Sequence, residues 1–365
     1  MVLFKMPHDW VKSALRLMNA MAGKTKKVDR VPYFALINEQ MLCRVAGVTV
    51  KEMLSSPEIY AKAVIGSYEF LEADTIQIPT SYAGPGEALA FAESNDKLDT
   101  IRWYDYKPLS IIQGAVCKTE EDIDKLEIPD HSKSSIWKVS TEAANIVNEK
   151  TKFPQMFGLG IWSVVQELRG VQAFKDMRKN PELLLKLCEK VYESQLDVFK
   201  FWTEKVGFSP MIMLTGYSFN KHMMSFDDAM KFEGQFIKRL QEKTKVPFIF
   251  HNCGTSPYFM EACKEIEFAA VNGSHPLDLD YWIKFKESYP NVTIMGANID
   301  VSREMLTGTP QDVEEKVRDN IIALAPGGRY VCSPVCCLPW GVPLGNIMAI
   351  PRALEKYGQY PLKIQ

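Results

Sequence analysis

Two short stretches of the sequence carry side chains that could bind a metal ion. His251 and Cys253 stand at the end of an apolar run that begins at Val246. Because residues two apart in a strand point to the same side, both would project together from its end. A second apolar run leads to further thiols, among them Cys336 and Cys337. An imidazole with two thiolates suits zinc, and three protein ligands leave a fourth position for water or substrate, which is typical of catalytic zinc sites.

The same residues also have an interpretation without metal. Neutral histidine and free cysteine are common inside protein cores, and a His-x-Cys pair is too short to be specific on its own. The second group of thiols favours the metal site, because it too follows an apolar run of strand type.

Composition limits the classes of partner. The 365 residues are 46% apolar, enough for one large domain or two of ordinary size. The formal net charge of −2, from 43 basic and 45 acidic residues, gives no electrostatic reason to expect nucleic acid or a membrane surface as a partner. The cysteines are irregularly spaced, no signal peptide is evident, and no run approaches the ~18 apolar residues of a membrane span. We therefore expect a cytoplasmic protein with reduced thiols.

The elements that must position these side chains follow a strand–helix repeat. Apolar patterns predict eight strands, at residues 31–38, 74–79, 153–160, 210–216, 246–253, 268–273, 292–298 and 329–336. The later helices are expected at residues 162–178, 181–206, 225–244, 257–266, 279–288, 310–324 and 343–357. This order predicts an α/β fold, a (β/α)8 TIM barrel made by residues 1–365 as a single domain. Chemistry in such barrels sits at the C-terminal strand ends, so the fifth and eighth strands would bring the candidate ligands to one rim.

Two regions lie outside this repeat. Residues 1–30, with helical spacing over 10–21, are expected to form an N-terminal helical cover. Residues 81–135 are less regular and predict an insertion after the second strand, made of loops and an antiparallel hairpin near the barrel mouth.

The motifs of the chain resemble those of a known group of enzymes. They are Asp29-Arg-Val-Pro32, Ala46-Gly47-Val48, residues 74–79, His251-Asn-Cys253-Gly254, Thr309-Pro-Gln-Asp-Val313, and residues 334–339 leading to Pro343-Leu-Gly-Asn346. Together they resemble the uroporphyrinogen decarboxylase superfamily and, within it, the zinc-dependent corrinoid methyltransferases of the MtaA/MtbA-like branch. The resemblance implies that His251, Cys253 and Cys336 bind Zn2+, with Cys332 and Cys337 as neighbours.

The resemblance also implies a reaction and a partner. The expected activity is methyl transfer between a small substrate and the cobalt of a cobalamin carried by a separate corrinoid-binding protein. A thiol acceptor is slightly favoured, and a donor-side O-demethylation, in which a methoxylated and aromatic compound gives its methyl group to Co(I), is the alternative. A metal-free decarboxylase of the parent type and a non-catalytic binding barrel remain as other classes, and the oligomeric state is open.

Two departures from the family pattern bear on these alternatives. Family members often have an acidic residue after the sixth strand, where this chain has a loop containing His275. His275 is a candidate fourth ligand or proton carrier, or else a loop residue without such a role. The arginine cluster that would bind the carboxylates of a porphyrinogen is missing from residues 36–44, which argues against the decarboxylase.

The remaining candidates stand at or near strand ends. Glu87 is a candidate catalytic or orienting carboxylate and Asn298 a candidate substrate ligand, although caps and barrel-end hydrogen bonds would use the same residues. Trp162, Tyr217 and Trp340 are candidates for the wall of an apolar substrate pocket, with a place in the core or rim as the alternative.

Overall fold

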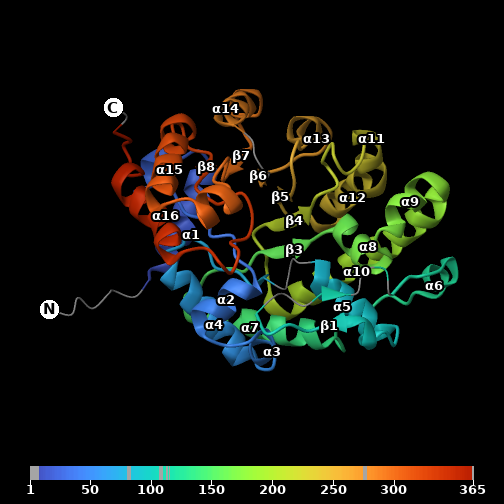
Figure 1. Ribbon diagram of the computed structural model, residues 1–365. Coiled ribbons are helices and arrows are strands. Elements are labelled where there is room, and N and C mark those ends of the chain that lie inside the picture. The colour runs from blue at the N-terminus through green and yellow to red at the C-terminus, as the bar shows by residue number, and fades with distance from the viewer. Residues whose placement is uncertain are drawn as a thin grey trace.

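A parallel sheet of six regular strands forms the centre of the protein. The computed structural model describes residues 8–79, 84–106, 110–111, 114, 116–273 and 278–363. In it the strands run in the order β3-β4-β5-β6-β7-β8, each parallel to its neighbour (Figure 1). Their bounds are β3 (Phe157–Leu159), β4 (Ile212–Gly216), β5 (Phe248–Asn252), β6 (Ala270–Asn272), β7 (Thr293–Met295) and β8 (Tyr330–Val331). These six match the last six predicted strands in order and centre.

Two buried extended segments continue the sheet beyond β8. Tyr33 pairs in parallel with Cys332, and the Phe34 N–H donates to the Cys332 carbonyl at 2.8 Å. The Asp74 N–H in turn donates to the Tyr33 carbonyl at 2.8 Å. The first two predicted strands therefore lie where a (β/α)8 barrel requires them, as irregular segments. Prolines in both, at positions 32 and 79, remove ladder donors, which accounts for the loss of regular pairing.

Helices surround the strands and cover their outer faces (Figure 1). Those between the strands and after β8 are α8 (Ile161–Arg169), α9 (Gln172–Lys179), α10 (Pro181–Val206), α11 (Phe226–Ala229), α12 (Gln235–Thr244), α13 (Phe259–Glu265), α14 (Leu279–Ser288), α15 (Pro310–Leu324) and α16 (Leu344–Tyr357), with π-helical turns η4 (Met230–Gly234) and η5 (Val301–Thr307). The helix predicted over residues 162–178 is divided in two, because Gly170 adopts a φ of 63° that ends α8. The predicted start at Thr309 is confirmed by a capping box with Asp312.

The N-terminal helical extension predicted before the barrel is confirmed over the described residues, which begin at residue 8. Helix α1 (Trp10–Met21) buries one face and is fixed by Arg16, which forms ion pairs with Asp29 and with the fully buried Asp74. Asp74 also accepts a hydrogen bond from the Tyr33 N–H at 2.8 Å. These contacts join the cover to both irregular barrel segments. The following elements are η1 (Thr25–Lys27), α2 (Glu39–Ala46), α3 (Val50–Met53) and α4 (Pro57–Phe70).

The insertion after the second barrel segment contains the predicted hairpin and also helices that the sequence did not indicate. Strands β1 (Ile101–Arg102) and β2 (Ser110–Ile111) pair antiparallel. Around them lie α5 (Gly84–Ser94), η3 (Leu98–Thr100), α6 (Glu120–Lys125) and α7 (Ser135–Thr151). The expectation of irregular structure was therefore wrong for α5. Its start, Gly-Pro-Gly, is typical of a turn, and residues 86–92 are buried on every side, so no polar face marks the helix.

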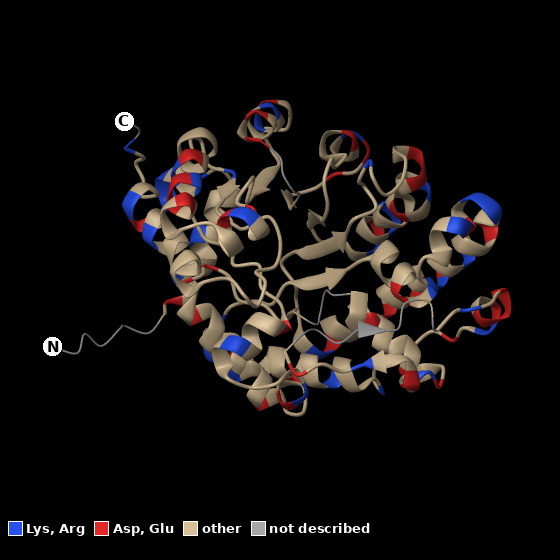
Figure 2. Ribbon diagram, in the orientation of Figure 1, with Lys and Arg blue, Asp and Glu red and all other residues tan. Residues whose placement is uncertain are grey.

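One continuous cluster of buried apolar side chains extends from Trp10 to Leu354, which supports the proposal of a single domain. Figure 2 shows the six strands of the parallel sheet free of Lys, Arg, Asp and Glu, while both signs of charge are interspersed on the outer helices. Within the described ranges, none of the helices combines the length and the apolar character needed to cross a membrane.

Candidate metal centre and cavity

The barrel brings together the three residues predicted as metal ligands. His251 is in β5, Cys253 follows that strand, and Cys336 lies in the loop after β8. His251 Nε2 is 2.9 Å from Cys253 Sγ, and the two sulfur atoms are 3.4 Å apart. All three ligand atoms lie within 4.8 Å of one another. Such a triangle can hold one ion and leave a coordination position open.

Backbone hydrogen bonds hold both thiol-bearing loops in place. The Cys253 N–H donates to the Gly216 carbonyl at the end of β4, at 2.8 Å. On either side of Cys336, the Val335 N–H donates to the Ile299 carbonyl at 3.0 Å and the Leu338 N–H to the Leu36 carbonyl at 3.1 Å. The backbone of both thiol-bearing loops is therefore fixed by the end of β4, by the loop after β7 and by the first barrel segment.

The imidazole of His251 is oriented by a neighbour that the sequence did not reveal. His251 pairs in register with Asn272 of β6, and its Nδ1 is 2.6 Å from Asn272 Oδ1. The Asn272 amide nitrogen donates to the Met295 carbonyl at 2.6 Å, so its oxygen must face the imidazole as an acceptor. Nδ1 therefore carries the proton, and Nε2 directs its lone pair towards the thiols. This is the tautomer that a metal ligand needs.

The donor set and its spacing fit zinc. Tetrahedral zinc with Zn–S bonds of about 2.3 Å places two sulfur ligands about 3.8 Å apart, close to the observed separation of 3.4 Å. The hydrogen bond with Cys336, together with burial, raises the pKa of the Cys253 thiol well above its usual value. The pKa of the Cys337 thiol is raised in the same way, by its hydrogen bond with Cys336 and by burial. A divalent cation supplies the positive charge that adjacent thiolates require.

Glycine is required beside the imidazole. Gly273 has a φ of 102°, and a Cβ there would lie 2.9 Å from the Asn252 carbonyl and 3.1 Å from His251 Nδ1. Both the conformation and the space exclude a larger residue.

A cavity of ≈ 280 Å³ opens beside the three ligands. It lies between the N-terminus of α2, the start of α5, α8 and the end of β4. Its lining residues are Leu36, Asn38, Glu39, Pro79, Gly84, Pro85, Ser163, Glu167, Thr215, Gly216, Tyr217, His251, Cys253, Cys336 and Cys337. The cavity is small for an organic ligand and places it against the thiols.

Two carboxyl groups in this lining were missed by the sequence analysis. Glu39, in the first turn of α2, is 5% exposed, and burial raises its pKa to about 7. Burial also raises the pKa of Glu167, on α8, to about 7. Burial and the nearby Glu167 raise the pKa of Tyr217, which keeps that phenol protonated. A charged residue within a helical pattern is typical of a solvated face, so only the barrel geometry reveals these carboxyls.

Of the residues predicted to line or bind in the substrate pocket, only some lie at the cavity. Tyr217 lines the cavity. Trp162 is fully buried with its ring against Phe174 at 5.3 Å, and Trp340 is 37% exposed and packs against Tyr106 at 5.0 Å. Asn298 follows β7 and is 6% exposed. Among the described residues these last three predicted side chains are not part of the cavity wall.

Glu87 lies in a buried network of its own. It accepts hydrogen bonds from His131 Nε2 at 3.0 Å, from Trp137 Nε1 at 2.9 Å and from the Ser194 hydroxyl. His131 Nδ1 is bonded to Asp197 at 2.8 Å. Burial lowers the pKa of His131, but the two carboxylates outweigh it and the net shift is upwards. These contacts are those of a structural group that ties α5 to α7 and α10. His275 lies outside the described residues.

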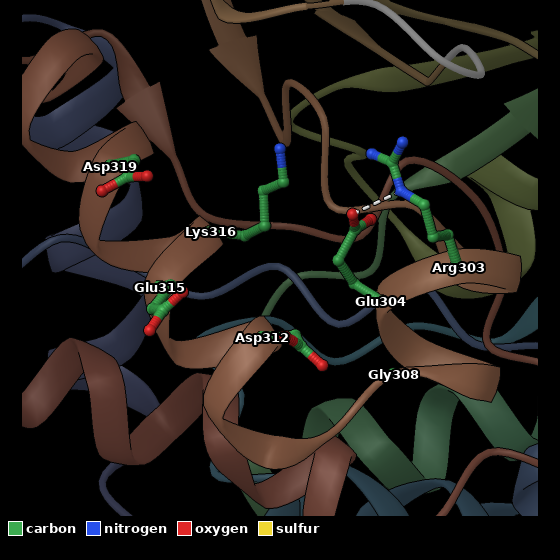
Figure 3. Close-up of a pocket in the computed structure, with 7 residues that line it drawn as sticks. All are labelled: Arg303, Glu304, Gly308, Asp312, Glu315, Lys316 and Asp319. Carbon is green, nitrogen blue, oxygen red and sulfur yellow. Dashed lines mark hydrogen bonds and ion pairs between the residues drawn. The ribbon is translucent and has the colours of Figure 1, made fainter.

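A second hollow, of ≈ 380 Å³, lies on the surface between η5 and α15 (Figure 3). Its charges are largely paired: Arg303 and Glu304 form an ion pair at 2.6 Å, and Asp312 caps the Thr309 N–H at 2.7 Å. Its lining, Arg303, Glu304, Gly308, Asp312, Glu315, Lys316 and Asp319, holds no thiol or imidazole. We therefore assign the functional site to the smaller cavity.

Comparison with known proteins identifies the family to which the chain belongs. The model of the uroporphyrinogen decarboxylase (URO-D) family matches residues 12–357, almost the whole chain. The chain belongs to the uroporphyrinogen decarboxylase family. This is a family of enzymes, and the family predicted from the motifs is thereby confirmed.

Solved structures support the fold of this family member. A methyltransferase from Methanosarcina mazei superposes with a TM-score of 0.77 at 19% identity, covering 94% of this chain and 98% of that one. At that identity the likeness shows the (β/α)8 fold. A B12-independent methionine synthase from Shewanella sp. W3-18-1, in complex with selenomethionine, gives a TM-score of 0.40 at 17% identity over 59% of this chain and 65% of that one, which is too low for an argument. No curated protein matches the sequence.

Proposed function

We propose that this protein is a zinc-dependent methyltransferase that moves a methyl group between a small substrate and a corrinoid carried by a separate protein. The observation that carries the proposal is the cluster of one imidazole and two thiols at the C-terminal end of the barrel, open to a small cavity. Membership of the family and the motifs of the methyltransferase branch support it.

His251, Cys253 and Cys336 would hold the zinc ion. Zinc bound there supplies a Lewis-acidic centre, which lowers the pKa of a substrate thiol or polarises an ether oxygen. Asn272 keeps Nε2 of the imidazole available and increases its basicity by accepting the Nδ1 proton in a hydrogen bond.

The cavity wall sets the size of the substrate. Leu36, Pro79 and Tyr217 contribute apolar surface to the cavity wall, which would exclude water from a methyl group. Its ≈ 280 Å³ suits a small molecule, whereas a corrinoid is far too large to enter. The cobalt would therefore approach from the mouth of the barrel, carried by the partner protein.

A thiol acceptor remains the favoured direction. Two thiolates and an imidazole make an electron-rich centre, which keeps a bound thiolate nucleophilic and polarises an ether oxygen less strongly. Methoxylated donors stay the alternative. A decarboxylase of the parent type is disfavoured because the described cavity lining holds no arginine or lysine for a polycarboxylate.

Metal analysis tests the proposal. We expect one zinc per chain and methyl transfer from methylcobalamin to 2-mercaptoethanol. Cys253→Ser and Cys336→Ser should lose the metal, because each removes one thiolate ligand. Cys263→Ser and Cys332→Ser are the matched controls, since both thiols lie outside the triangle of ligand atoms, and both should keep it.

Full zinc in both ligand variants would disprove the site. A zinc-loaded protein that methylates none of a broad panel of thiols, yet demethylates a methoxyaromatic compound with a Co(I) corrinoid, would establish the reverse direction. X-ray absorption at the zinc edge provides a second measurement, because a bound thiol substrate adds one sulfur to the count.

A further inference from the structure

The charge in the lining of the cavity is of one sign. Glu39 and Glu167 are its ordinarily charged residues, and the described lining contains no lysine or arginine. A substrate in this cavity therefore meets negative potential.

The unsatisfied polar atoms of the lining are hydrogen-bond acceptors. Glu167 Oε2 and Asn38 Oδ1 are buried, and neither has a hydrogen-bond partner within the part of the chain that the structure describes. A buried acceptor without a donor costs free energy, so both atoms are stabilised by a ligand that brings N–H or O–H groups.

Other buried carboxyl groups of this protein have partners: most lie against a cation or a histidine, and Glu233 accepts hydrogen bonds from the Ser218 hydroxyl and the backbone N–H of Trp162. Asp74 is paired with Arg16 and Arg30, and Asp176 with Arg169 at 2.8 Å. Glu39 and Glu167 form no ion pair with any described residue. An unpaired buried carboxyl is destabilising, and two of them, without a partner among the described residues, line one cavity, which points to a positive charge brought by a bound ligand.

We propose that the small substrate of this site carries an ammonium group, which Glu39 and Glu167 bind while the reacting atom lies at the thiols and imidazole. This inference rests on the proposed function, and for a thiol acceptor it specifies an aminothiol. Thiols that carry a carboxylate or sulfonate would be repelled by the same two residues.

The methyl transfer itself leaves the ammonium group unchanged. An electron pair of the substrate sulfur forms the S–C bond, the pair of the broken Co–C bond remains on cobalt as Co(I), and the thiol proton passes to solvent. The two carboxyl groups act as binding residues and take no part in the bond changes.

The protonation of the carboxyls gives the inference a second readout. Burial raises the pKa of both to about 7, so near neutral pH the empty cavity holds about one proton between them. A bound ammonium favours the ionised forms and lowers both pKa values. Binding of cysteamine should therefore release more protons than binding of 2-mercaptoethanol, which loses only its thiol proton at zinc, and the difference should fall as the pH rises above 7.

The test compares thiols that share a short alkyl chain and differ in charge: cysteamine, 2-mercaptoethanol, 3-mercaptopropionate and 2-mercaptoethanesulfonate. With the zinc-loaded protein and methylcobalamin, kcat/KM should be about tenfold higher for cysteamine than for 2-mercaptoethanol, and lower again for the two anions. Calorimetric titration of cysteamine in buffers of different ionisation enthalpy measures Kd and proton release independently of turnover.

Isosteric variants separate the charge of the cavity from the intrinsic reactivity of each thiol. Glu39→Gln and Glu167→Gln should each reduce the cysteamine to 2-mercaptoethanol ratio severalfold, and the double variant should bring it near one. Glu315→Gln, which removes one negative charge from the surface hollow of Figure 3, is the matched control and should keep the wild-type ratio.

The outcomes distinguish this inference from the proposed function. Turnover of all four thiols without a preference for cysteamine, or a preference that survives the double variant, overturns the ammonium site and leaves the methyltransferase intact. If no thiol is methylated, calorimetric binding of cysteamine over the anions, lost in the double variant, still supports the ammonium site. If the glutamine variants fail to fold, the preference of the wild-type protein for cysteamine over the neutral and anionic thiols decides whether the ammonium site exists.

Discussion

Asn272 offers the sharpest test of how the imidazole is held. Replacing it with alanine removes the 2.6 Å hydrogen bond to His251 Nδ1 and leaves the Met295 carbonyl without its donor. Loss of such an orienting partner typically weakens metal binding 10–100-fold, which corresponds to about 1.4–2.7 kcal/mol. We expect Asn272→Ala to lower zinc affinity by that factor, measured by competition with a chromophoric chelator.

Two companion variants make the result specific. Asn272→Asp keeps an acceptor for the Nδ1 proton and should retain zinc affinity, although the lost donor to the Met295 carbonyl lowers the thermal midpoint. Asn346→Ala removes a structural amide that donates to the carbonyls of Met305 and Gly308, and it should lower the midpoint without changing zinc affinity. Zinc affinity of Asn272→Ala within twofold of wild type would refute the orienting role.

Two further predictions concern the backbone beside the site and the buried network behind it. Gly273→Ala should lose zinc and lower the free energy of unfolding by about 1–3 kcal/mol, because its Cβ meets the Asn252 carbonyl and the imidazole. Gly207→Ala is the control: Gly207 has a φ of 98° and nothing within 4 Å of the added Cβ, so this variant carries the conformational cost alone and should keep zinc in the same chelator assay. The raised folded-state pKa of His131 means that its charge contributes stability fully below pH 6.5, and that this contribution is lost as the pH rises through the folded value. The thermal midpoint of the wild type should therefore exceed that of His131→Gln most at acid pH, and the difference should shrink above neutrality. A difference that stays constant with pH would contradict a stabilising charge on His131.

The sequence predicted those parts of the barrel in which local pattern and tertiary environment agree. Strands buried on both faces gave apolar runs from Phe153 onward, and the capping box at Thr309 marked its helix without help from packing. The sequence did not predict helix α5, because burial on all sides removes the amphipathic pattern. The apolar residues of the two irregular segments predicted their positions in the barrel. Their poor hydrogen bonding was not predictable, because it depends on where the prolines lie relative to the neighbouring strand.

The candidate site was predictable only to the extent that ligand chemistry is visible in residue types. His251, Cys253 and Cys336 form a recognisable set, and the structure brings them together. Asn272 orients the imidazole because the register of β5 and β6 places it opposite, and register is a property of the assembled sheet. Glu39 and Glu167 reach one cavity from helices far apart in the chain, which no local pattern encodes.

The bridge between Tyr33 and Cys332 has a consequence for biosynthesis. It joins two segments that are far apart in the sequence, so the ring of the barrel cannot close until Cys332 has left the ribosome. Until then the apolar stretch from Val31 to Ile37, wholly buried in the finished protein, lacks its partner strand. The nascent chain should therefore depend on chaperones until the segment at Cys332 has been made. Refolding followed by pulsed hydrogen exchange should show protection of the Phe34 amide among the last to appear.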